Sequence, residues 1–245
     1  MRLTRVHIDT PLAAGMELAL PESAATHLVR VLRLEPGAAC VLFNGDGHDY
    51  GARILSAGKR EVRVVIEASE RVERESPLQI VLLQGVARGE KMDLILQKAT
   101  ELGVMAIHPL WSQRSEVKLD GPRTDKRLAH WRSVVGSACG QSGRARIPEV
   151  APPLALDKAL TALVPGGTRL TLDPEGALAF STLEIDPAGP VVLAIGPEGG
   201  WSPRDRQQLA DAGFAGLRLG PRILRTETAG LAAIAALQAR FGDFG

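Results

Sequence analysis

The sequence predicts an α/β protein in which a small β-rich module precedes a larger α/β domain. Residues 191–195 form a continuous apolar run, which is typical of a strand buried on both faces of a parallel sheet, and they end on a Gly-Pro pair. Residues 216–219 are predicted as a second strand, which ends on another Gly-Pro pair. Because ligands bind at the carboxyl ends of parallel strands, the two turns predict a binding site at one edge of the sheet.

Length and composition fit a globular protein. The chain has 245 residues, of which 45% are hydrophobic, so it can bury one large core or two modest ones. Residues 1–9 lack the apolar core of a signal peptide, and the longest apolar run, near residues 231–237, is too short to span a bilayer. Cys40 and Cys139 are isolated, without metal-ligand spacing. We therefore expect a cytoplasmic protein without membrane association or a bound metal.

Charge is unevenly distributed although the net charge is only +1. Residues 84–146 contain 11 Lys and Arg against 6 Asp and Glu, whereas residues 147–245 contain 8 against 11. A basic middle segment is compatible with an RNA-facing surface. It is equally compatible with the solvated face of a helix, and charge alone does not decide between the two.

The N-terminal module is expected to span residues 1–72. It begins with a helix over residues 21–33, in which His27, Arg30 and Arg33 are spaced so that at least two share a face. That face is either solvated or an RNA contact. Strands follow, and the Asn-Gly pair at the start of residues 44–47 predicts a hairpin turn between two of them. The strands are predicted over residues 39–43, 49–55 and 61–66.

The second domain is expected to span residues 73–245, and residues 71–77, which are polar and end in proline, are expected to form the linker across this boundary. Its first elements are a strand over residues 80–83, a helix over 91–102 and a strand over 104–110. Residues 85–91 have the wrong spacing for a phosphate-binding loop, and no G-x-G-x-x-G follows a strand. The usual dinucleotide-binding fold is therefore excluded.

Two helices are expected after the Gly-Pro turns. Ser202 is predicted as the N-cap of the first, with Pro203 at its first position and Asp205 completing a capping box. The second helix is predicted over residues 226–241, with Thr226 as its cap. This helix is apolar almost all round, so more than one of its sides must be covered.

The motifs AIGPEGGW (residues 194–201) and LGPRILRTETA (residues 219–229) resemble the signature motifs of the RsmE family, the ribosomal RNA small subunit methyltransferases E. That family belongs to the SPOUT superfamily of knotted methyltransferases. The resemblance extends over nearly the whole chain, through residues 97–104, Pro109, residues 113–115, Trp131, residues 138–144 and residues 147–148. There are three departures from the family pattern. The family usually has Glu at the positions of Gly140 and Asp205, and it usually has Lys-Gly-Asp-Arg at residues 88–91, where this chain has Arg-Gly-Glu-Lys.

The resemblance implies a SPOUT-type, trefoil-knotted α/β domain after a PUA-like, RNA-binding β-barrel. It also implies that three strand-end loops, at residues 172–175, 195–200 and 219–226, bind S-adenosylmethionine, with the adenine held by backbone groups and apolar side chains. A partner subunit would cover the last helix, making a homodimer. The implied cofactor-binding residues are Leu172, Ile195, Gly196, Pro197, Glu198, Gly199, Gly200, Leu219, Gly220, Ile223, Leu224 and Thr226.

The implied reaction is methyl transfer to N3 of a uridine in 16S ribosomal RNA, within the assembled or nearly assembled small subunit. Arg225 is the expected electrostatic catalyst, because its charge is permanent. Glu198 is expected either as base or orienter, or as a structural brace that pairs with Arg225 or Arg222. The candidate RNA-binding residues are Arg30, Arg33, Arg88, Lys91, Arg114 and Arg144.

Two other functions remain open. The chain could be a non-catalytic RNA-binding protein of ribosome assembly that binds no S-adenosylmethionine. Alternatively, Gly199, Gly200 and the helix start at Ser202 could form the phosphate site of a different α/β enzyme. The carboxylate of Glu198 beside that helix start argues against an anion there.

Overall fold

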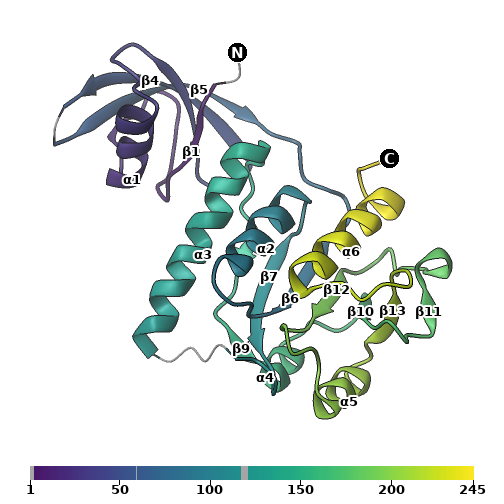
Figure 1. Ribbon diagram of the computed structural model, residues 1–245. Helices are drawn as coiled ribbons and strands as arrows, with labels where there is room; N and C mark the ends of the chain where they lie inside the picture. Colours follow the sequence, from purple (N-terminus) through teal and green to yellow (C-terminus); the bar gives the residue numbers. More distant parts are fainter. Residues whose placement is uncertain (1–2, 59, 117–120) are drawn as a thin grey trace. The chain divides into compact units, whose positions relative to one another are not determined.

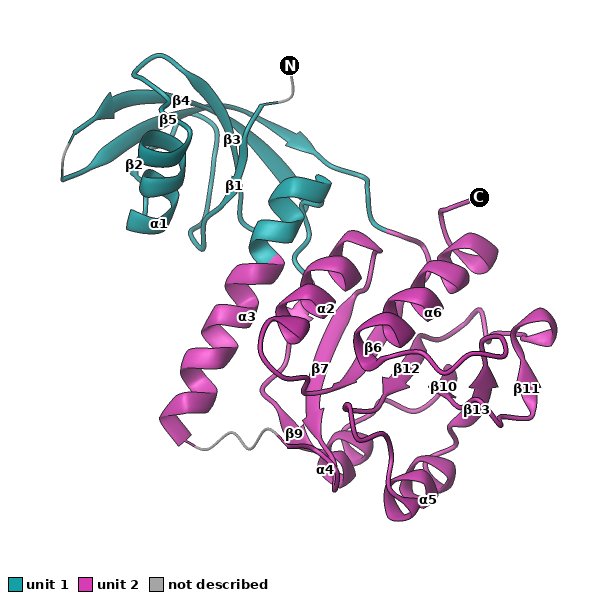
Figure 2. Ribbon diagram, in the orientation of Figure 1, with its two compact units in different colours: residues 1–75, 136–147 teal, residues 76–135, 148–245 magenta. Residues whose placement is uncertain are grey.

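The computed structural model describes residues 3–58, 60–116 and 121–245, which form two compact units (Figure 2). Unit 1 comprises Met1–Glu75 together with Gly136–Ile147, and unit 2 comprises Ser76–Val135 together with Pro148–Gly245. Unit 1 therefore includes a segment from the middle of the chain, which lies beyond the boundary expected after residue 72. Within the described residues, every helix is too short or too polar to cross a lipid bilayer.

Unit 1 contains a five-stranded sheet in which only the pairing of β1 with β3 is parallel. Leu42, Ile54 and Val64 lie in its core and are almost fully buried. The predicted strand over residues 39–43 is confirmed, and the other two extend further than expected. In spatial order the strands are β1 (Arg5–His7), β3 (Ala39–Phe43), β4 (His48–Ala57), β5 (Val62–Arg71) and β2 (Glu17–Ala19).

The predicted helix of unit 1 consists of two pieces. A short α1 (Glu22–Ala25) continues as a π-helical turn, η1 (Thr26–Val31), in which the N–H of Leu32 donates to the carbonyl of His27 at 3.0 Å. Leu28 points into the core, whereas Arg30 and Arg33 are exposed. The helical position is as expected, but the wider winding is a backbone detail that side-chain periodicity does not specify.

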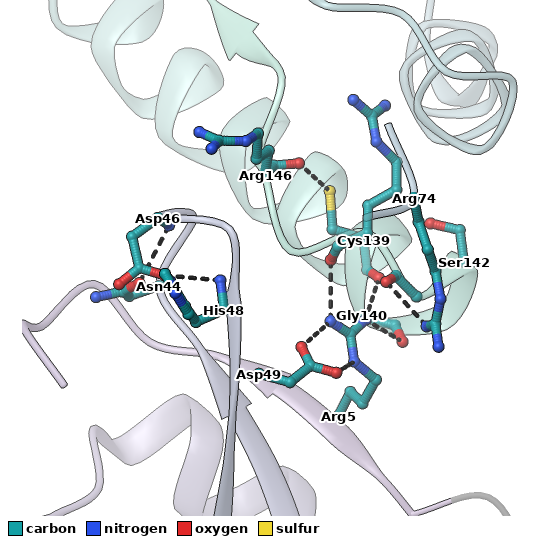
Figure 3. A network of polar contacts seen from close by, with 12 residues as sticks. Arg5, Asn44, Asp46, His48, Asp49, Arg74, Cys139, Gly140, Ser142 and Arg146 are labelled. Carbon is teal, nitrogen blue, oxygen red and sulfur yellow. Dashed lines mark hydrogen bonds and ion pairs between the residues drawn. The ribbon is translucent and has the colours of Figure 1, made fainter. Parts of the chain in front are cut away.

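Arg5 ties the segment 136–147 to the sheet of unit 1 (Figure 3). Its guanidinium donates to the carbonyls of Cys139 at 2.8 Å and Arg144 at 3.1 Å, and it also binds Asp49, with Nε 3.0 Å from Oδ2. A Cβ atom on Gly140 would lie 3.1 Å from the carbonyl oxygen of Arg5. Glycine at this position thus lets β1 approach closely, which gives a physical reason for the absence of the usual glutamate.

Unit 2 is built on an eight-stranded sheet whose pairings are all parallel across the described residues. Strand β10 lies between β12 and β13, so the two strands that end in Gly-Pro turns flank it at a common edge. The spatial order is β11 (Leu178–Ala179), β13 (Ala215–Arg218), β10 (Thr168–Leu172), β12 (Val191–Ile195), β6 (Ile80–Gly85), β7 (Ala106–Trp111) and β8 (Glu149–Val150), with β9 (Leu154–Ala155) also beside β7.

Helices cover both faces of this sheet (Figure 1). On one face lie α2 (Glu90–Glu101) and α6 (Thr226–Phe241), and on the other lie α4 (Leu156–Thr161) and α5 (Pro203–Asp211). Strand β12 is buried along its whole length, as predicted. The remaining helices are α3 (Gly121–Ser142), which runs from unit 2 into unit 1, and the 3₁₀ turn η2 (Phe180–Thr182).

The starts of α5 and α6 differ in how they are capped. The capping box of α5 is confirmed, because the N–H of Asp205 donates to Ser202 Oγ at 3.1 Å and the N–H of Ser202 donates to Asp205 Oδ2 at 2.9 Å. The predicted cap of α6 is wrong. Arg225 occupies the N-cap position without a side-chain cap, and the Thr226 hydroxyl instead donates to the carbonyl of Gly196 at 2.6 Å.

Candidate active site

A cavity of about 590 Å³ opens at the edge of unit 2 where β10, β12 and β13 end. Each of the predicted cofactor-binding residues lines this cavity except Gly199. The three expected loops therefore meet at one site. The described residues that line it are Lys91, Leu172, Asp173, Pro174, Ile195, Gly196, Pro197, Glu198, Gly200, Trp201, Arg206, Leu217, Leu219, Gly220, Arg222, Ile223, Leu224, Arg225, Thr226, Glu227 and Ala229.

The first Gly-Pro turn is packed too closely for side chains. A Cβ atom on Gly85, at the end of β6, would lie 2.5 Å from the nitrogen of Pro197, and one on Gly196 would lie 3.3 Å from the Trp201 ring. Gly200 has a φ of +64°, which L side chains rarely adopt. These glycines hold the turn tight, so its backbone forms part of the cavity wall.

Gly199 faces the segment after β7 and does not line the cavity. A Cβ atom on Gly199 would lie 3.1 Å from both Cβ and the carbonyl oxygen of Arg114. The Arg114 guanidinium in turn donates to the carbonyl of Gly199 at 3.2 Å. The glycine pair therefore has two roles: Gly199 accommodates a neighbouring loop, and Gly200 turns the chain beside the cavity.

Trp201 lies among the cavity-lining residues and is 94% buried, since its relative exposure is 6%. Its indole N–H donates to the Thr171 hydroxyl at 3.0 Å, and that hydroxyl donates to the carbonyl of Ala194 at 3.0 Å. The chain of bonds joins the ends of β10 and β12. Trp201 was not among the predicted site residues, although an aromatic side chain directly after two turn glycines was a usable signal.

Gln84 and Thr226 join the start of α6 to the ends of β6 and β12. The Gln84 side-chain amide donates to the Thr226 hydroxyl at 3.1 Å and to the carbonyl of Gly85 at 2.9 Å. Gln84 is fully buried and was not among the predicted site residues. A polar side chain within an otherwise apolar strand was the signal, because buried polar groups need specific partners.

A group of charged side chains borders the cavity. The Glu198 carboxylate accepts a hydrogen bond at 3.0 Å from the backbone N–H of Arg88. Lys91 Nζ lies between two carboxylates, 3.7 Å from Glu198 Oε1 and 3.5 Å from Glu227 Oε2. In the described part of the chain, the partners of Glu198 are thus Arg88 and Lys91, and the expected brace to Arg225 or Arg222 is not formed.

These partners determine the ionisation of Glu198. Partial burial opposes its charge, but the hydrogen bonds from the N–H of Arg88 and from its own backbone N–H, together with the charges of Lys91 and Arg88, lower the pKa of the carboxyl below its usual value. A carboxylate with a lowered pKa is a weak proton acceptor at neutral pH. Glu198 is therefore better suited to orienting its neighbours than to removing a proton.

The candidate RNA-binding residues occupy several environments. Arg30 and Arg33 are exposed on unit 1, and Arg88 and Arg114 are exposed on unit 2 beside residues 198–199. Lys91 faces the two glutamates of the cavity. Arg144 is buried in unit 1, where its Nε donates to Glu75 Oε2 at 3.0 Å, so its placement is that of a structural residue.

Comparisons with known proteins agree with this architecture. A family model described as an RNA methyltransferase domain matches residues 74–238, and one described as an RNA methyltransferase PUA domain matches residues 20–67. The chain is 33% identical over 242 residues, 99% of its length, to ribosomal RNA small subunit methyltransferase E of Buchnera aphidicola, 98% of which is covered.

Two solved structures also match over the full length of both chains. The structure of a ribosomal RNA small subunit methyltransferase E from Neisseria gonorrhoeae bound to S-adenosyl methionine is 41% identical, with a TM-score of 0.94. The structure of a putative methyltransferase from Legionella pneumophila in complex with S-adenosylmethionine is 38% identical, with a TM-score of 0.95.

Proposed function

The chain belongs to the RNA methyltransferase family of the ribosomal RNA small subunit methyltransferases E, and from this premise we propose that it methylates N3 of a uridine in 16S ribosomal RNA. The methyl donor is S-adenosylmethionine, and the substrate is the assembled or nearly assembled small subunit in the cytoplasm. The observation that supports this most strongly is the cavity formed where the two Gly-Pro turns meet the end of β10.

The cavity fits S-adenosylmethionine in size and chemistry. Its volume of about 590 Å³ lies within the usual range for sites of small ligands and cofactors. Apolar contacts come from Leu172, Ile195, Leu219 and Leu224. The glycine turns expose backbone N–H and C=O groups that can form hydrogen bonds with a purine. The bound cofactor supplies an electrophilic methyl group on a cationic sulfur, and an apolar wall does little to stabilise that charge before transfer.

Arg225 acts on the uridine in this proposal. Its side chain is exposed at the cavity and follows Ile223 and Leu224 in the wall. A guanidinium would repel the cationic sulfur, so its favourable partner is an oxygen of the uracil ring, where negative charge develops as N3 loses its proton. Glu198 supports the site from its rim by holding Lys91 and the backbone of Arg88.

RNA contacts are proposed for each unit by itself: Arg30 and Arg33 on unit 1, and Arg88 and Arg114 on unit 2. These exposed cations suit phosphate groups, whose neutralisation contributes a large share of the affinity for nucleic acids. Residues 1–72 would act as the RNA-binding domain and residues 73–245 as the methyltransferase domain, with the expected C-terminal knot. Arg144 contributes only by stabilising unit 1 through Glu75.

We also propose a homodimer that is held by the outer side of α6. One side of this helix is buried and includes residues 229, 230, 233, 234, 237 and 238. Next to it lies an apolar stripe that is only half-buried, formed by Leu231, Ala232, Ala235 and Ala236. Ile223, on the rim of the cavity, is 84% exposed. A second copy of the chain would cover both apolar surfaces.

Calorimetric titration with S-adenosylmethionine tests the cofactor site. We expect the wild-type protein to bind and Leu224→Arg to lose binding, because the new cation would lie in the apolar wall near the cationic sulfur. Val164→Arg makes the same change at a position that is 74% exposed and outside the cavity lining, and it should bind normally. Absence of wild-type binding, or equal binding by both variants, would contradict the proposed site.

A further inference from the structure

Three carboxylates line the cavity, and two of them are occupied by hydrogen bonds. Asp173 accepts from Arg206 at 2.8 Å and from the N–H of Glu175 at 3.0 Å. Glu198 accepts from the N–H of Arg88. Glu227 differs, because none of the described residues donates a hydrogen bond to its carboxylate, and its Oε2 atom is buried.

The backbone of Glu227 is held firmly next to the cavity. Glu227 is in the first turn of α6, directly after Thr226, whose hydroxyl is fixed between Gln84 and the carbonyl of Gly196. The Glu227 side chain is only 16% exposed, and Lys91 Nζ lies 3.5 Å from Oε2. The ammonium group thus lies beside Oε2, and no hydrogen bond from the described residues occupies the carboxylate of this cavity-lining residue.

We propose that Glu227 is the catalytic base that accepts the N3 proton of the uridine, and that Lys91 is its positioning residue. This inference rests on the proposed function. It gives Lys91 a role inside the cavity in place of the RNA contact expected from the sequence. The supporting geometry is a partly buried carboxylate with unused acceptor capacity, beside Arg225, in a cavity that fits the methyl donor.

The proton transfer balances in charge and electrons. The proton of N3–H passes to Glu227, and the electron pair of that bond forms the new bond between N3 and the methyl carbon. The electron pair of the broken carbon–sulfur bond stays on sulfur, which becomes a neutral thioether. The carboxylate and the sulfonium thus lose their opposite charges together, and no further reactant is needed.

The pH dependence of the reaction also involves the charged groups around Glu227. Lys91 reaches it from α2, Glu198 borders it from the turn after β12, and Arg222 and Arg225 line the cavity from the turn before α6. Asp173 and Arg206 pair with each other. Among these groups, the pKa of Glu198 is lowered, so it is already ionised well below neutral pH.

Single-turnover methyl transfer to small subunits that lack the modification, measured across pH, tests the inference. We expect Glu227→Gln to slow transfer at neutral pH by about a hundredfold or more, the usual loss on removing a general base. Its rate should continue to rise at alkaline pH, where solvent ionises the uridine, whereas the wild-type rate should level off. S-adenosylmethionine affinity, subunit affinity and melting temperature should stay close to wild type.

Matched variants complete the test. Glu184→Gln removes an exposed carboxylate outside the cavity lining and should leave the rate unchanged. Lys91→Met should lower the single-turnover rate without weakening subunit binding, and Lys91→Arg should keep most of the wild-type rate.

A Glu227→Gln rate equal to wild type overturns this inference alone. A joint fall in melting temperature and cofactor affinity, with a pH profile parallel to wild type, shows a structural role and also overturns it. Wild-type protein that methylates no subunit overturns the proposed function and this inference together.

Discussion

Arg225 shows how a single residue takes its role from its surroundings. It is permanently charged, exposed and placed after two apolar residues in a wall that faces a cationic ligand. The residue with which it was expected to form a brace, Glu198, has other partners, the N–H of Arg88 and the ammonium of Lys91. Both residues line the cavity, but they do not pair with each other in the described part of the chain, and in the proposed function Arg225 acts on the substrate.

Substitution of Arg225 distinguishes a catalytic role from a structural one. Arg225→Lys keeps the positive charge but loses the planar guanidinium with its several N–H donors. We expect it to lower the single-turnover rate by roughly a hundredfold, as for loss of a preorganised hydrogen-bond donor. S-adenosylmethionine affinity should stay within a few-fold, and melting temperature should not change, because the side chain is exposed. A parallel loss of rate, affinity and melting temperature in Arg225→Lys and Arg225→Ala would contradict the catalytic assignment.

At the scale of elements, the bounds of a helix or strand were predicted correctly where a local pattern of apolar residues determines them. The strand at residues 191–195 and the helix at residues 226–241 have the expected bounds, because a continuous apolar run and a helical apolar pattern are strong signals. The π-helical winding of residues 26–31 and the short strands β8, β9 and β11 were missed. Two-residue strands have no periodicity of their own, and they form only because a neighbouring strand supplies the hydrogen bonds.

The capping box of α5 should contribute measurably to stability. Ser202 and Asp205 are both buried and satisfy each other's backbone N–H groups. We expect Ser202→Ala to lower the free energy of unfolding by about 1 kcal/mol, as for loss of an N-cap. Ser133→Ala, at an exposed position inside α3, should change it by less than about 0.5 kcal/mol. Urea titration measures both, and equal values would mean that the cap contributes nothing.

At the scale of the whole molecule, the sequence located the site but not all the contacts that build it. The two Gly-Pro turns predicted a site at this edge of the sheet, because ligands bind at the carboxyl ends of parallel strands. The family resemblance supplied the individual residues, and all of them except Gly199 line the cavity. The contributions of Gln84, Trp201 and Lys91 depend on which strands and helices become neighbours, which no local pattern shows. The inclusion of residues 136–147 in unit 1 depends similarly on Arg5, more than 130 positions away. The knot expected from the family resemblance stays a prediction.

The proposed homodimer makes a prediction about the outer stripe of α6. Sedimentation of the wild-type protein should give twice the chain mass of 26.1 kDa. Ala235→Arg should yield monomers, because it places a charge in the half-buried apolar stripe, whereas Ala210→Arg, at an exposed position on α5, should remain dimeric. A stable monomeric wild type with full activity would contradict the proposed dimer.

The central claim is that this chain methylates N3 of a uridine in 16S ribosomal RNA. The most direct test is mass mapping of the methylated nucleosides of 16S RNA from cells with and without the protein, followed by treatment of the unmodified small subunits with purified protein and S-adenosylmethionine. We predict that 3-methyluridine at one position is absent from the deficient cells and is restored by the wild-type protein. Unchanged methylation in the deficient cells, or a restored methyl group on another atom or base, would contradict the claim.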